Sequence, residues 1–141
     1  MAKIEKILFV DDDTICAYLN VTLVEGLGIA EEVMSINSAE EALQYIQEHY
    51  SGKAAFVREH PDLIFLDIKM PGMDGFEFLQ ELEGLKQVDR NRFLIIMLTA
   101  SLNPGDKEKA ACQSDKLFAC LSKPLVEADV KKLLKGLLQA G

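Results

Sequence analysis

The sequence predicts an α/β fold in which a doubly wound parallel sheet of five strands has helices on both faces. Five short, almost entirely apolar runs recur along the chain, and amphipathic segments with helical spacing separate them. Continuous rather than alternating apolar runs are typical of strands buried on both faces of a parallel sheet. Strict alternation of strands and helices favours three layers with right-handed crossovers. The length of 141 residues is that of a single domain.

The five apolar runs give the expected strands, which are Ile7–Val10, Val33–Ile36, Leu63–Leu66, Phe93–Leu98 and Leu117–Leu121. The first helix is expected after the first run, because Ile15, Tyr18 and Leu19 keep helical spacing. Gly28 can close this helix, since glycine readily takes the left-handed conformation of a helix C-cap.

Two later helices carry a recognisable start signal. Ser38 with Glu41, and Asp74 with Glu77, have the spacing of a capping box, in which each side chain bonds the other residue's backbone N–H. Apolar residues follow each pair at helical spacing. We therefore expect helices to begin at both places.

The remaining segments are less regular. Asn103 and Pro104 read as an N-cap and first helical residue, but the stretch to Cys112 has few apolar residues, so its helix should be exposed and marginal. The last helix places the apolar residues of Val126–Leu138 on one face. We expect Tyr50–His60 to be a helix extension followed by a surface loop, with His49 and His60 as ordinary surface residues.

Composition excludes several classes of function. The net charge of −8 falls entirely within residues 1–70, and no basic cluster offsets it, which argues against direct binding of nucleic acid or an anionic membrane. No apolar run approaches the roughly 20 residues that cross a bilayer. The N-terminus lacks the pattern of a signal peptide. Three cysteines without a C-x-x-C pair suggest free thiols, so we expect a cytoplasmic protein.

Polar residues follow four of the five strands, where the carboxyl ends of a parallel sheet form its binding edge. They are Asp11, Asp12 and Asp13 after the first run, Asp67 after the third, Thr99, Ala100 and Ser101 after the fourth, and Ser122, Lys123 and Pro124 after the fifth. The fold therefore brings several carboxylates, hydroxyls and one ammonium group to the same edge of the sheet.

The chemistry of such an edge is specific. Clustered carboxylates repel one another unless a cation neutralises them, and hard oxygen ligands suit Mg²⁺. A carboxylate beside such a cation can act as a nucleophile towards a phosphoryl group. Asp13, and to a lesser extent Asp12, could instead simply cap the following helix. Asp67 could not, because the sequence that follows it, IKMPG, starts no helix.

The run LIFLDIKMPGMDGFEFL, together with FVDDD, LTAS and SKPL, resembles the receiver domain of two-component response regulators. The resemblance covers nearly the whole chain and implies a flavodoxin-like sheet with strand order 2-1-3-4-5. It also implies a single receiver domain over residues 1–141 with no output domain. Such a domain signals through protein contacts and is not an enzyme acting on other substrates.

The resemblance assigns a role to the carboxylates. Asp67 would accept a phosphoryl group from a histidine kinase or a phosphotransfer protein. Asp12 would bind Mg²⁺ (or Mn²⁺) directly, Asp11 would assist through water, and the backbone carbonyl of Lys69 would complete the protein ligands.

It also assigns the phosphate-binding and switch residues. Thr99, Ala100 and Lys123 would bind the phosphoryl oxygens, with Thr99 moving towards them as the switch. The peptide bond before Pro124 would be cis, and the side chains of Lys69 and Ser101 would tune how fast water removes the phosphoryl group.

One position departs from the family pattern. The third residue before the lysine is often Tyr or Phe, a switch aromatic, but here it is Cys120, with Phe118 two residues earlier. We expect Cys120 to be a small apolar residue in a buried strand. Cys16 and Cys112, both in helical stretches, receive the same interpretation.

Two other functions compete with a receiver. Asp11 to Thr14 also matches the D-x-D-x-T opening of haloacid-dehalogenase-like phosphatases, with Asp11 as nucleophile and Asp13 as acid/base. That family needs a later acidic pair on a strand, which the chain lacks after Lys123, and it leaves DIKMPGMDG unexplained. The second alternative is a receiver-like interaction module that never uses phosphate, although the complete set of site residues argues against it.

The output surface is expected on the C-terminal side of the fold. Pro104–Cys112, the Leu117–Leu121 strand and the final helix would form a surface that responds to phosphorylation, because a marginal helix is easily shifted. Candidate partners are a kinase, a phosphotransfer protein, a downstream effector or a second copy in a phosphate-linked homodimer.

Overall fold

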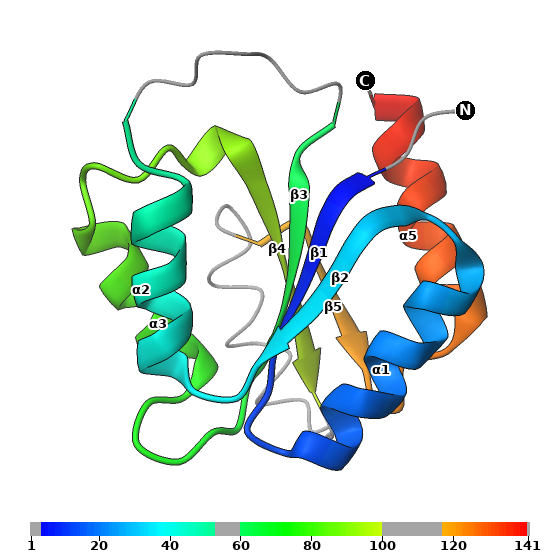
Figure 1. Cartoon of the computed structure of the whole chain (residues 1–141), viewed down its shortest axis with the longest axis horizontal. Coiled ribbons are helices and arrows are strands. Elements are labelled where there is room, and N and C mark those ends of the chain that lie inside the picture. Colours follow the sequence, from blue (N-terminus) through cyan, green and yellow to red (C-terminus); the bar gives the residue numbers. More distant parts are fainter. Residues whose placement is uncertain (1–3, 53–59, 100–116, 141) are drawn as a thin grey trace.

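The computed structural model describes residues 4–52, 60–99 and 117–140, and shows the predicted three-layer α/β arrangement (Figure 1). Its elements are β1 (Ile4–Val10), α1 (Thr14–Leu27), β2 (Ala30–Ile36), α2 (Ala39–His49), β3 (Asp62–Asp67), α3 (Gly75–Gly84), a 3₁₀ turn (Arg90–Arg92), β4 (Phe93–Thr99), β5 (Ala119–Ser122) and α5 (Glu127–Ala140). The strands are parallel and lie in the order β2-β1-β3-β4-β5, which confirms the predicted topology.

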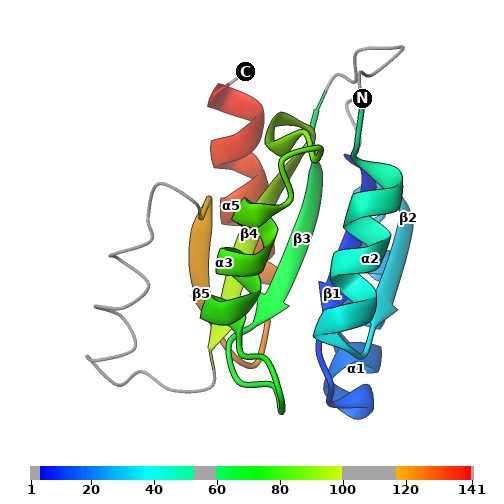
Figure 2. The same ribbon diagram turned by 90° about the vertical axis from the view of Figure 1, so that its left-hand side faces the viewer.

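The two faces of the sheet bury separate apolar cores. In β1, Leu8 and Val10 pack with residues of α2 and α3, whereas Ile7 and Phe9 pack with residues of α1 and α5. Figure 2 shows α2 and α3 on one side of the sheet and α5 on the other. Because both faces are covered, every residue of β3 is buried, and this is why the strand sequences are continuously apolar.

Helix starts follow the side-chain caps that the sequence contains. The Asp13 carboxylate accepts the N–H groups of Ile15 and Cys16 at 3.0 and 3.1 Å, so Asp13 is the N-cap of α1. At the other end of α1, Gly28 has φ of 64° and closes the helix as predicted.

Capping boxes were predicted at the starts of α2 and α3, and the structure shows a complete box at α3 and the Ser38 half of the one at α2. Asp74 and Glu77 form a complete capping box at the start of α3, with bonds of 2.8 and 3.3 Å. At the start of α2 the Ser38 hydroxyl accepts the N–H of Glu41 at 3.3 Å. These side chains satisfy backbone donors that the first helical turn leaves without partners.

The start of the segment Tyr50–His60 differs from the prediction. Helix α2 ends at His49, and Tyr50 is only 1% exposed rather than part of a surface loop. Its hydroxyl donates to Asp62 Oδ2 at 2.5 Å and its ring packs against Phe93. A buried tyrosine needs a polar partner, and Asp62 at the start of β3 supplies it. His49 is exposed as expected, whereas His60 is half-buried.

Two features near β5 also bear on the predictions. The strand is Ala119–Ser122, two residues later at its start than expected, although Phe118 N–H still donates to Ile95 O at 2.8 Å. The peptide bond between Lys123 and Pro124 is cis, as the family resemblance implied. Ala100, Ser101, the predicted helix Pro104–Cys112 and the segment 53–59 lie outside the described residues.

Candidate functional site

Three acidic side chains meet at the carboxyl edge of the sheet, as the strand order requires. Asp11 and Asp12 follow β1, and Asp67 is the last residue of the neighbouring strand β3. One carboxylate oxygen from each lies within 4.8 Å of the others. Asp11 and Asp67 are buried, whereas Asp12 is exposed, so the cluster opens to solvent on the side of Asp12.

Lys123 reaches this cluster from the loop after β5. Its Nζ lies 3.2 Å from Asp11 Oδ2 and 3.1 Å from Asp67 Oδ1. The lysine side chain is 16% exposed, and those of Asp11 and Asp67 are 3% and 8% exposed. The backbone holds the loop in place, because Lys123 N–H donates to Thr99 O at 2.7 Å. A single ammonium group is therefore shared between two buried carboxylates.

Burial, and then the contacts with neighbouring charges, shift the pKa values of Asp67 and Lys123. Burial raises the pKa of Asp67 and Asp11 adds to the rise, while the hydrogen bond and charge of Lys123 oppose it. Burial alone would lower the pKa of Lys123, but its hydrogen bond to Asp67 and the charges of Asp67 and Asp11 raise it. The lysine is therefore held in its charged form, and the carboxylates are left short of positive charge.

Backbone hydrogen bonds and close packing fix the loop that follows Asp67. Ile68 N–H donates to Leu98 O at 3.1 Å, and Gly75 N–H donates to Ile68 O at 2.7 Å. A Cβ on Gly75 would lie only 3.0 Å from the Ile68 Cα and 3.1 Å from the Asp67 carbonyl oxygen, so only glycine fits there without a shift. Lys69 N–H donates to Asp67 Oδ1 at 3.4 Å, while its side chain is exposed.

The turn after β1 gives its three aspartates different positions. Asp11 Oδ1 accepts the N–H of Asp13 at 2.9 Å, and Asp13 itself caps α1. Asp13 is therefore engaged with the helix backbone, as the capping interpretation predicted. This arrangement argues against Asp13 as the acid/base of a phosphatase.

From the sequence, Cys16 was expected to be only a small apolar residue and Asn20 was assigned no role, yet Cys16 lies beside the cluster. Cys16 is half-buried, and burial, opposed by the charge of Lys123, raises the pKa of its thiol. The amide of buried Asn20 donates to Cys16 Sγ at 3.8 Å. Helical spacing could have indicated these two residues. Cys16 lies three residues after the Asp13 cap and Asn20 four residues later, so both face the same side of α1.

The strands β4 and β5 bring the remaining candidates. Thr99 ends β4, is buried, and lies in register with Ser122 of β5. Cys120 is exposed, so the prediction of a buried apolar residue was wrong. The prediction assumed that β5 is covered on both faces like β3, but β5 is an edge strand whose described residues are half-buried or exposed.

The donor set fits a small divalent cation. The carboxylates of Asp11, Asp12 and Asp67 together with the Lys123 ammonium leave two uncompensated negative charges if all are ionised. Carboxylate oxygens on two strands, with one side open to water, suit Mg²⁺, which prefers oxygen ligands and keeps several waters. The three carboxylates among the predicted ligands are thus close enough together to hold such an ion.

Comparison with known proteins gives one consistent family. The model of the response regulator receiver domain matches residues 7–135. A two-component response regulator from Cytophaga hutchinsonii has a similar structure, with a TM-score of 0.82 and 31% identity over 98% of this chain and 99% of that one. A two-component response regulator of Arabidopsis thaliana is 28% identical over 98% of this chain and 87% of its own length.

A further relative is much longer than this chain. Hybrid signal transduction histidine kinase L of Dictyostelium discoideum is 34% identical over 92% of this chain, which spans only 7% of the kinase. Among the described residues, no helix is long and apolar enough to cross a membrane. The fold, the cluster of aspartates beside Lys123 and the match over residues 7–135 agree, and the chain belongs to the response regulator receiver domains of two-component phosphorelay signalling.

Proposed function

We propose that the protein is a response regulator receiver that accepts a phosphoryl group on Asp67. The observation that carries this proposal is the position of Lys123, whose Nζ lies 3.1 Å from Asp67 and 3.2 Å from Asp11. Asp67 is a buried carboxylate that shares one ammonium partner and has two acidic neighbours. Such a carboxylate can act as a nucleophile, and the site has room for the positive charge of a cation and for a phosphoryl group.

The transfer step joins this carboxylate to the phosphorus of a phosphorylated histidine. An oxygen of Asp67 attacks the phosphorus, the P–N bond of the phosphohistidine breaks, and the imidazole leaves with the bonding electron pair. The Lys123 ammonium stabilises the negative charge on the phosphoryl oxygens. The hydroxyl of Thr99 and the backbone at Ala100 serve as further donors in this proposal, and Lys69 and Ser101 tune hydrolysis.

A bound metal ion belongs to the proposal. Asp11, Asp12, Asp67 and the backbone carbonyl of Lys69 would hold Mg²⁺ or Mn²⁺. The ion would neutralise charge on the transferring phosphoryl group. The protein's own contribution is to keep three carboxylates within 4.8 Å and to leave Asp12 accessible to solvent.

The proposed partners are proteins. The phosphoryl donor is a histidine kinase or a phosphotransfer protein, which is supported by relatives that carry a similar segment inside histidine kinases. Output passes to a downstream effector protein or to a second copy through protein contacts, in a cytoplasmic setting. The net charge of −8 supports a receiver that does not itself bind nucleic acid.

Phosphorylation by a small donor tests the proposal without knowledge of the kinase. We expect acetyl phosphate with Mg²⁺ to add one phosphoryl group, measured by intact mass, and Asp67→Asn to abolish the addition. Glu81→Gln, which removes an exposed carboxylate on α3, is the control and should be labelled like the native protein. An unlabelled native protein, under conditions that label another receiver, would mean that the domain works without phosphate.

A further inference from the structure

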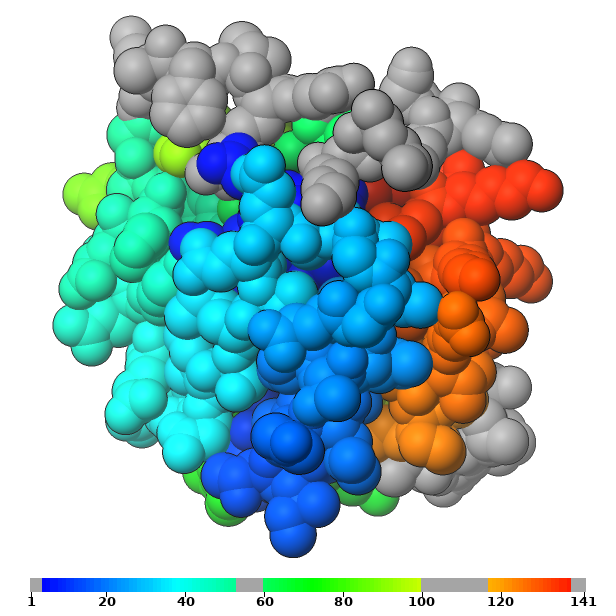
Figure 3. Space-filling model, turned by 45° about the vertical axis from the view of Figure 1, so that its right-hand side comes forward, coloured from blue at the N-terminus to red at the C-terminus, as the bar shows by residue number. Residues whose placement is uncertain are grey.

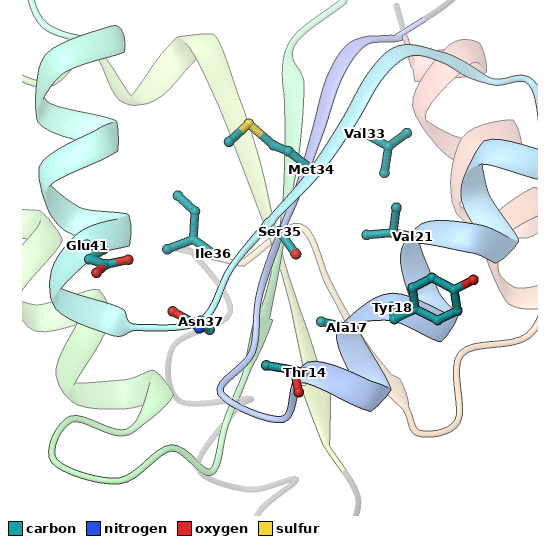
Figure 4. Close-up of a pocket in the computed structure, with 10 residues that line it drawn as sticks. All are labelled: Thr14, Ala17, Tyr18, Val21, Val33, Met34, Ser35, Ile36, Asn37 and Glu41. Carbon is teal, nitrogen blue, oxygen red and sulfur yellow. The ribbon is translucent and has the colours of Figure 1, made fainter.

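The edge strand β2 borders a groove that the proposed function does not use. Within the described residues β2 pairs with β1 alone, so N–H and C=O groups along its other side have no neighbouring strand. The groove, of about 470 Å³, follows the C-terminal half of β2 between α1 and α2 (Figure 4). Figure 3 shows that β2 reaches the surface between these two helices.

The groove has an apolar wall on each side of the strand. Val33 lies in register with Ile7, whose core is on the α1 side, and Met34 lies in register with Leu8, whose core is on the α2 side. In Figure 4, Val33 faces Val21 on one side of β2, whereas Met34 and Ile36 lie on the other. Side chains of an extended segment alternate between two sides, so an added strand could use both walls, whereas a helix would cover one.

Charge indicates what kind of segment fits. Glu31 and Glu32 are exposed on the N-terminal half of β2, and Glu41 lines the groove. Glu32 lies 3.9 Å from Lys6, and in the described parts of the chain no ion pair joins Glu31 or Glu41 to a base. A basic segment is therefore favoured. A second copy of this chain is disfavoured, since it would bring another pair of adjacent glutamates to an already acidic edge.

We propose that the outer edge of β2 binds an extended segment of a partner protein as a sixth strand. Lysine or arginine residues of the segment lie beside Glu31 and Glu32, and apolar residues lie beside Val33–Ile36. Main-chain hydrogen bonds to β2 supply affinity, and the two apolar walls and the acidic end supply selectivity. This site is at the opposite edge of the sheet from β5 and does not depend on phosphorylation of Asp67.

Synthetic peptides test the proposal on the intact protein. The probe is a capped, fluorescein-labelled peptide of two lysines followed by four alternating valines and isoleucines, used with its reversed sequence because strand direction is open. We expect binding in fluorescence anisotropy and shifts of the β2 amides in NMR spectra for one of the two. Methylation of alternate backbone nitrogens, or glutamates in place of the lysines, should abolish that binding.

Matched variants locate the binding site. Tyr18 lines the groove and is 69% exposed, and Glu31 is exposed, so neither Tyr18→Ala nor Glu31→Lys should disturb the fold. Each should weaken peptide binding about fivefold or more, the loss typical of a contributing interface residue. Val126→Ala and Glu81→Lys make the same kinds of change at exposed positions elsewhere and should leave binding unchanged.

Three results would overturn the proposal. The first is a lack of binding by either lysine peptide. The second is that the N-methylated peptide binds as tightly as the unmodified peptide, or that Tyr18→Ala and Glu31→Lys bind the peptide as tightly as the native protein. The outer edge of β2 would then play no part in binding. The third is self-association of the native protein through the β2 amides, which would make a second copy the occupant.

Discussion

The acidic residues of the site are held in an electrostatically unfavourable arrangement. Lys123 is the single described base in contact with the cluster, and it is shared between Asp11 and Asp67. The pKa of Asp67 is raised for this reason, because burial and the charge of Asp11 raise it by more than Lys123 lowers it. This loss of stability is the cost expected of the proposed site, which must hold a cation and a phosphoryl group.

Removing the charge of Asp67 should therefore stabilise the fold when metal is absent. A raised pKa means that the folded protein binds this proton more tightly than the unfolded chain, so ionisation of Asp67 lowers stability as the pH rises above 3.8 and through the folded pKa. In EDTA at pH 7, Asp67→Asn should raise the free energy of unfolding, because the buried charge is gone. The gain should vanish below pH 3.8.

Urea unfolding across this pH range measures the effect. Glu81→Gln, at an exposed site, should change the free energy of unfolding little at any pH. A loss of stability in Asp67→Asn at pH 7 would show that the pair with Lys123 outweighs burial.

Tyr50 and Asp62 form a second polar pair, at the opposite end of the sheet. Both residues are buried, and the tyrosine hydroxyl donates to Asp62 Oδ2 at 2.5 Å. Tyr50→Phe should lower the free energy of unfolding by about 1 to 3 kcal/mol, because a buried carboxylate oxygen loses the hydrogen bond from this hydroxyl. Tyr18→Phe removes an exposed hydroxyl and should cost little. Equal denaturant midpoints for the two variants would contradict this account.

Residues of the site were easier to predict than the residues around it. Asp67 and Lys123 follow apolar runs, and parallel strands bring their carboxyl ends together, so their meeting could be predicted from the sequence. The burial of Tyr50 could not be predicted in this way. It depends on a hydrogen bond to Asp62, and no sequence pattern showed that folding brings these two residues together. The exposure of Cys120 was missed because an edge strand and a central strand can have equally apolar sequences.

At the level of elements, the contact between α3 and the end of β3 positions Asp67. Helix α3 begins at Gly75, whose N–H donates to Ile68 O at 2.7 Å. A Cβ there would also come within 3.0 Å of Met97 Sδ. The capping box of Asp74 and Glu77 starts the helix at this point, so the local sequence signal and the close packing agree.

Gly75→Ala should disturb this contact. We expect a loss of about 1 to 3 kcal/mol in the free energy of unfolding, the usual cost of overpacking, and slower labelling by acetyl phosphate because Asp67 shifts. Gly84→Ala is the matched control, since no atom lies within 4 Å of a Cβ at the last residue of the same helix. It should be neutral or slightly stabilising. A normal labelling rate in Gly75→Ala would show that α3 does not position Asp67.

For the whole molecule, the strand order determines where charge accumulates. Aspartates follow β1 and end the neighbouring strand β3, and Lys123 in the loop after β5 contacts Asp11 and Asp67. The sequence predicted this order through the family resemblance, and the apolar runs located all five strands, with some ends shifted. The segment that the sequence assigned to output, Pro104–Cys112, lies outside the described residues.

Metal binding should stabilise the whole fold through this one edge. If Mg²⁺ binds the native site and not the unfolded chain, ten times its dissociation constant adds about 1.4 kcal/mol to the free energy of unfolding. Thermal unfolding should shift upward with Mg²⁺ and return on addition of EDTA. Asp12→Asn should blunt the shift, because Asp12 is the exposed acid of the cluster. An identical shift in Asp12→Asn would place the ion elsewhere.

Asp67, and no other group, is proposed to take the phosphoryl group. Borohydride reduces an acyl phosphate to an alcohol, so the protein treated with acetyl phosphate and Mg²⁺ can be reduced, digested and sequenced by mass spectrometry. We predict a homoserine in place of Asp67, absent without the phosphoryl donor and absent from Asp67→Asn. Reduction at Asp11, the nucleophile of the phosphatase alternative, or at no aspartate, would contradict the account.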